Sequence, residues 1–139
     1  MFKQILVGID GSENSYRALD YARNLAEHYG AGVCLLSAYR RTSDLLGYDD
    51  FEKLLSRRKA AGQLILDEAH KRLGQAAFTV QEELLEGPPA DAILKAARIR
   101  KADLIVVGSR GRGALEGMVL GSVSSKVTQL AECPVLVIR

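Results

Sequence analysis

Hydrophobic residues in this chain form short continuous runs that alternate with longer stretches of helical periodicity. The short runs are rich in Ile, Leu and Val and are bounded by glycine, proline or polar residues, as is typical of buried strands. They predict strands over residues 2–9, 32–39, 78–85, 104–107 and 135–138. The stretches between them place apolar residues on one helix face, and they predict helices over residues 12–29, over 50–73, from Pro88-Pro89 onward, and over 122–132.

The alternation of strands and helices predicts one α/β domain over residues 1–139. Such an order indicates a single doubly wound, five-stranded parallel sheet that is sandwiched by four helices in a Rossmann-like arrangement. The strand at 78–85 alternates apolar and polar residues only in part, which favours a position near the sheet edge. Gly62 lies inside the long helix, where glycine costs about 1 kcal/mol relative to alanine, so we expect close packing there.

The chain has the composition of an ordinary globular protein, with 47% hydrophobic and 26% charged residues. Its formal net charge of +2 is too small to indicate a nucleic-acid partner. No apolar run approaches the roughly 20 residues that a membrane span needs. We expect a cytoplasmic protein, because no signal-peptide pattern precedes the first strand. In that reducing compartment, Cys34 and Cys133 are interpreted as small, unpaired hydrophobes.

The segment after the strand at 104–107 is the strongest candidate for chemistry. Gly108 and Gly111 follow the strand, nine residues separate Gly111 from Gly121, and Ser122 opens the last helix. Glycine lets backbone N–H groups approach an anion closely, and a helix N-terminus adds partial positive charge, so the segment predicts a phosphate cradle. It is not a P-loop, because the chain has no Gly-Lys pair. It is not a dinucleotide fingerprint either, because Glu116 stands where the last glycine belongs.

The glycine spacing, taken with its flanking segments, resembles the ATP-binding branch of the universal stress protein family. The similarity extends over the whole chain, including residues 5–12, 102–111, 121–124 and 133–137. It implies an adenine nucleotide alpha hydrolase-like fold and ATP as the bound cofactor, with or without magnesium or manganese. It also implies a nucleotide-dependent stress-response or signalling module that hydrolyses ATP slowly at most.

The resemblance implies a role for each matching residue. The three motif glycines would wrap the phosphates, and Ser122 would donate its hydroxyl and N–H groups to them. Asp10 would lie by the adenine or ribose, Ala38 would contact adenine through its backbone, and Val107 would pack near the ribose and base. The candidate nucleotide-binding residues are Gly8, Asp10, Ala38, Val107, Gly108, Arg110, Gly111, Gly121, Ser122 and Val123.

Several of these residues have simpler interpretations that the sequence leaves open. Ser122 could serve only as a helix N-cap, and Asp10 only as the turn residue before Gly11. Arg110 and Arg112 suit phosphate oxygens, but both could equally be solvated side chains of the loop.

Catalysis has little support in the sequence. His28 and His70 fall near the ends of predicted helices, away from the carboxyl ends of the strands, and we predict no catalytic residue. Two alternative functions remain, namely a nucleotide-independent dimeric interaction module of the same fold and a weak ATPase or adenylyl-transfer enzyme. The glycine spacing argues against the first alternative. The turn after the first strand lacks a His or Ser-Gly-rich motif, which argues against the second.

The last predicted strand, Val135–Ile138, is short and strongly apolar. An apolar strand at a sheet edge favours pairing with another chain, so we predict a homodimer with these strands antiparallel across a two-fold axis. Burial of the same strand by helices is an equally compatible interpretation. A further protein partner is expected, but the sequence does not indicate its identity.

Overall fold

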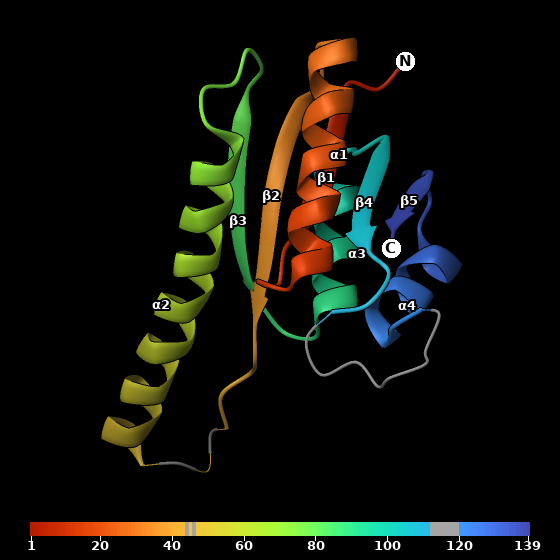
Figure 1. The fold of residues 1–139 in the computed structure, drawn as a ribbon. Helices are drawn as coiled ribbons and strands as arrows, with labels where there is room; N and C mark the ends of the chain where they lie inside the picture. The colour runs from red at the N-terminus through yellow and green to blue at the C-terminus, as the bar shows by residue number, and fades with distance from the viewer. Residues whose placement is uncertain (44, 46, 112–119) are drawn as a thin grey trace.

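The computed structural model describes residues 1–43, 45, 47–111 and 120–139. Within these residues, five strands alternate with four helices, as the hydrophobic pattern predicts (Figure 1). The elements are β1 (Gln4–Gly8), α1 (Glu13–Tyr29), β2 (Gly32–Tyr39), α2 (Tyr48–Leu73), β3 (Val80–Glu86), α3 (Pro89–Arg100), β4 (Leu104–Gly108), α4 (Ser122–Leu130) and β5 (Val135–Ile138). The largest differences from the predicted bounds are two residues: β1 and β3 begin two residues later, α2 begins two residues earlier, and α4 ends two residues earlier.

All strand pairs are parallel, and the order across the sheet is β3-β2-β1-β4-β5. The chain moves outward from β1 to β2 and β3, and then returns to the other side of β1 for β4 and β5. This confirms the doubly wound fold and puts the reversal of strand order between β1 and β4. Ligands of open α/β sheets bind beyond the carboxyl ends of the strands at such a point.

The helices cover both faces of the sheet, with α1 and α2 on one face and α3 and α4 on the other (Figure 1). Alternate residues of each central strand enter the two cores. Ile5 and Val7 pack with the α1 and α2 side, whereas Leu6 packs with the α3 and α4 side. All three are at most 1% exposed. Strands that are buried on both faces read as continuous apolar runs, which is why the periodicity located them.

Two local signals in α1 and α2 have clear structural causes. The Ser12 hydroxyl accepts a hydrogen bond from the Ser15 N–H and caps α1, and Gly30 ends that helix with a φ of 68°. A Cβ atom at position 62 would lie 2.5 Å from Cδ1 of Leu84, so α2 lies directly against β3 at Gly62. The close packing expected there is therefore confirmed.

The two edge strands differ in character. The β3 strand forms one edge, as its partial alternation predicts; its Glu82 contacts the His70 ring at 2.6 Å, and its Glu83 is ion-paired to Arg100. The β5 strand forms the other edge with three half-buried residues, Val135 to Val137, followed by a buried Ile138. Across the described parts of the chain, no helix combines the length and the apolar character that a membrane crossing requires.

Candidate functional site

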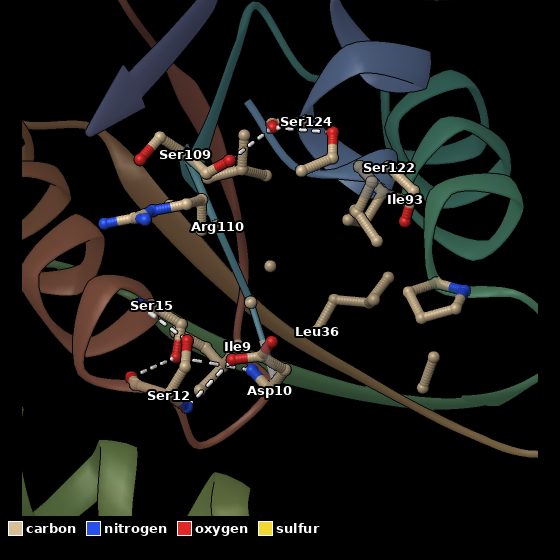
Figure 2. A pocket seen from close by; sticks show the side chains of 18 residues that line it. Ile9, Asp10, Ser12, Ser15, Leu36, Ile93, Ser109, Arg110, Ser122 and Ser124 are labelled. Carbon is tan, nitrogen blue, oxygen red and sulfur yellow. Dashed lines mark hydrogen bonds between the residues drawn. The ribbon is translucent and has the colours of Figure 1, made fainter. Parts of the chain in front are cut away.

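A pocket of about 310 Å³ opens at the carboxyl ends of β1 and β4, where the strand order reverses (Figure 2). Its lining comes from the turn after β1, the end of β2, the first turns of α3 and α4, and the loop after β4. All ten residues that the sequence proposed for a nucleotide line this pocket. The structure therefore brings the candidates together, while their contact with a nucleotide remains a prediction.

One wall of the pocket is apolar. Leu36 from β2, Ile93 from α3 and Val107 from β4 form it, and their side chains are 1%, 3% and 3% exposed. Ala38 and Pro89 complete this wall. A flat, weakly polar ring would bury its faces here without leaving protein polar groups unsatisfied.

The start of α4 forms another part of the lining. Gly121 is the N-cap, and it has no side chain that could accept a hydrogen bond from the first turn of this helix. The first N–H groups of a helix have no intrahelical partner, and the helix dipole adds partial positive charge there. The interpretation of Ser122 as the N-cap is wrong. Gly121 holds that position, and Ser122 is the first residue of the helix, where it is exposed.

The turn after β1 holds Asp10 in one orientation. Its Oδ1 accepts a hydrogen bond of 2.8 Å from the Ser12 N–H, and its own N–H donates to the Ser15 hydroxyl over 3.4 Å. Asp10 is therefore a turn residue, as the simpler interpretation held, and it also lines the pocket. Its Oδ2 lies so close to Gly111 that a Cβ at that position would collide with it.

The first motif glycine has a packing role that the sequence did not indicate. A Cβ at position 108 would lie 2.8 Å from Cβ and 2.9 Å from the carbonyl carbon of Asn14, in the first turn of α1. Close approach of the α1 backbone therefore accounts for glycine at position 108, whether or not an anion is bound. At position 8 a Cβ would lie 2.8 Å from Cδ1 of Ile93, which is the tip of a side chain.

Arg110 is exposed, and its side chain extends toward α1 and away from Ile93 (Figure 2). Arg112 lies outside the described residues. His70 is paired with Glu82 at 2.6 Å on the β3 edge and does not line the pocket. Among the residues that the structure covers, no three His, Cys, Asp or Glu side chains gather as metal ligands.

Eight of the described residues that line the pocket are not among the ten candidates. Ile93 and Leu36 have the spacing of ordinary core residues, so periodicity could not separate the two roles. Ser109 and Ser124 are buried polar residues, which is a signal that only burial reveals. The full set is Ile9, Ser12, Ser15, Leu36, Pro89, Ile93, Ser109 and Ser124.

Comparison with known proteins gives consistent matches over the whole chain. The model of the universal stress protein family matches residues 1–139. A universal stress protein of Thermus aquaticus is 43% identical over 141 residues, with all of both chains covered. The solved structure of universal stress protein UspA from Lactobacillus plantarum has a TM-score of 0.88 at 26% identity, covering 99% of this chain and 98% of that one. A universal stress protein solved in complex with cAMP has a TM-score of 0.77 at 33% identity, covering 99% and 97%.

Proposed function

Because this chain belongs to the universal stress protein family, we propose that it is a single-domain module whose pocket binds ATP. Occupancy of the pocket would then act as the signal that a protein partner reads. One observation carries the proposal: apolar side chains, a helix N-terminus without a side-chain cap and a glycine-rich loop line the same pocket. An adenine ring and a phosphate chain are the two chemically different parts of one ligand that would use both parts of this lining.

The proposed pose follows from the positions of these two parts of the lining. Adenine would lie against Ile93 and Val107, near the backbone of Ala38. The ribose would face Asp10. The phosphates would then accept hydrogen bonds from the first N–H groups of α4 and from the Ser122 hydroxyl. Arg110 could turn from its exposed position toward the phosphates and add positive charge.

A related protein supports an adenine nucleotide as the ligand class, since its structure is described as a complex with cAMP. Cyclic AMP carries one phosphate, whereas the proposal for this chain is a triphosphate. ATP, ADP, AMP and cAMP therefore belong in the same titration. We expect ATP to bind most tightly, because its longer phosphate chain reaches more of the N–H groups at α4.

Isothermal titration calorimetry tests the proposal with a matched pair of glycine variants. Gly121 and Gly47 are both helix N-caps with extended backbone, at φ of −80° and −62°. Gly121 lines the pocket, whereas a Cβ at Gly47 would meet no atom of the described residues within 4 Å. We expect Gly121→Val to weaken ATP binding at least about tenfold, a difference of roughly 1.4 kcal/mol, and Gly47→Val to leave it unchanged.

The same titration contains the result that would end the proposal. If the wild-type protein binds no adenine nucleotide at millimolar ligand, the pocket has another use. Steady release of phosphate from ATP at several turnovers per minute, in the presence of magnesium or manganese, would instead favour the weak ATPase.

We also propose that the functional unit is a homodimer formed through β5. Its side chains are apolar and mostly half-buried, and a second copy in antiparallel orientation would pair with the outer backbone groups of this edge strand. Multi-angle light scattering should give twice the 15.1 kDa chain mass at micromolar concentration, and a clean monomer would refute the dimer. A cytoplasmic location fits the free state of Cys34 and Cys133, and fractionation of the source cells would test it.

A further inference from the structure

Ser109 is the junction between the pocket and three secondary-structure elements. It is 2% exposed, and its polar groups all have partners. Its N–H donates to the Ile138 carbonyl of β5 over 2.6 Å, and its hydroxyl accepts from the Asn14 amide of α1 over 3.3 Å. Its carbonyl accepts from the Gly121 N–H and from the Ser124 hydroxyl, both in α4 or at its cap.

Ser124 supplies the side-chain part of this connection. Ser124 is 1% exposed, and its hydroxyl lies 2.7 Å from the Ser109 carbonyl and 3.2 Å from the Gly121 carbonyl (Figure 2). A hydroxyl donates one hydrogen, and the shorter distance favours the bond to Ser109. This bond therefore ties the first turn of α4 to the end of β4, across the gap between the second and third motif glycines.

We propose that Ser124 is a positioning residue that fixes the direction of the α4 N-terminus toward the phosphate part of the pocket. Without the Ser124 hydroxyl, the hydrogen bond donated by the Gly121 N–H would be the one that still joins the start of α4 to the Ser109 carbonyl within the described residues. A single bond permits the helix start to pivot. N–H groups that attract an anion must point at it, because hydrogen bonds weaken steeply with angle. The proposal rests on the proposed function in taking ATP as the ligand.

The test compares Ser124→Ala with Ser125→Ala in the full chain. Ser125 is the next residue of α4 and is not part of the pocket lining that the structure describes. Alanine is the best helix former, so both variants should keep the fold, and circular dichroism checks this. ATP, adenosine and inorganic tripolyphosphate are titrated into each protein by calorimetry. These ligands separate the phosphate contribution to affinity from the contribution of the base and sugar.

We expect Ser124→Ala to weaken ATP and tripolyphosphate about fivefold, the factor associated with one lost hydrogen bond, and to leave adenosine unchanged. Ser125→Ala should change none of the three. Equal loss for ATP and adenosine would mean a general loosening of the pocket and would overturn the positioning role. Wild-type affinity for ATP in Ser124→Ala would overturn it as well.

Failure of the proposed function gives a different pattern. If the wild-type protein binds tripolyphosphate but not ATP, the nucleotide assignment is wrong. The positioning role then stands when Ser124→Ala alone weakens tripolyphosphate. If the wild-type protein binds neither ligand, both proposals are wrong.

Discussion

Replacing Gly108 with alanine should destabilise the protein even without ligand. The added Cβ would lie 2.8 Å, 2.9 Å and 3.0 Å from Cβ, the carbonyl carbon and the carbonyl oxygen of Asn14, well inside the ordinary contact range of 3.4–4 Å. Two of these atoms are backbone, so no change of rotamer relieves the overlap. The helix α1 itself must move, although Ala18 and Leu19 anchor it in the core with 0% exposure.

The expected cost is that of overpacking a well-packed site, about 1–3 kcal/mol in the free energy of unfolding. For a chain of this size, that loss corresponds to roughly 3–10 °C in Tm. Urea denaturation in the absence of nucleotide measures it directly, since the midpoint should fall while the slope stays constant.

Two other glycine-to-alanine variants supply the scale for this measurement. At position 121 the new Cβ would lie 3.3 Å from the Ser109 carbonyl oxygen, a contact that a small shift relieves. At position 47 it would meet nothing within 4 Å in the part of the chain that the structure describes. Stability should therefore fall most for Gly108→Ala, less for Gly121→Ala and least for Gly47→Ala. If Gly108→Ala is as stable as Gly47→Ala, helix packing does not require glycine there, and anion access becomes the better explanation.

Three further predictions concern regions away from the pocket. Lys101 ends α3 with a φ of 55°, so Lys101→Gly should raise the free energy of unfolding by about 0.5–1 kcal/mol in urea denaturation, whereas Lys101→Ala should not. Burial raises the pKa of Cys34 to about 11 and also raises the pKa of the half-buried Cys133, so few of these thiols are in the reactive thiolate form at pH 8. Ellman's reagent at pH 8 should therefore label Cys133 slowly and the buried Cys34 only after unfolding. A hydrogen bond from Arg72 lowers the pKa of Asp20. This pair therefore stabilises the fold above the usual carboxyl pKa near 3.8 and loses its effect as the pH falls below that value. Asp20→Asn should flatten this part of the plot of unfolding free energy against pH.

The fold could be predicted because its signals are local. Each buried strand is a continuous apolar run, and each helix has an apolar face or a cap such as Ser12. Gly62 could be recognised because glycine is unfavourable inside a helix and therefore needs a packing reason. The element order then restricts the topology, since parallel strands need crossover helices of one hand.

The pocket could be predicted only where its residues follow strands or match the glycine spacing. Ile93 belongs to the pocket because α3 happens to place one of its core-facing side chains at the open end of the sheet. The bond from Ser124 to Ser109 joins residues that are 15 positions apart, and no periodicity encodes such a contact. The packing role of Gly108 likewise depends on where α1 crosses β4. These features need the tertiary structure, because they arise between elements and not within one.

The contrast between the two sheet edges decides where a second copy could add to this fold. Along β3, Glu82 and Glu83 hold the side chains of His70 and Arg100 at 2.6 Å and 2.7 Å, so another strand would have to displace or desolvate these polar side chains. Along Val135–Ile138, every side chain is apolar, and pairing there would remove hydrophobic surface from water. The difference lies in the sequence itself, since 80–86 contains three glutamates and 135–138 contains no charged residue. We therefore expect association through β5, beside the strand that leads into the glycine loop, and not through β3.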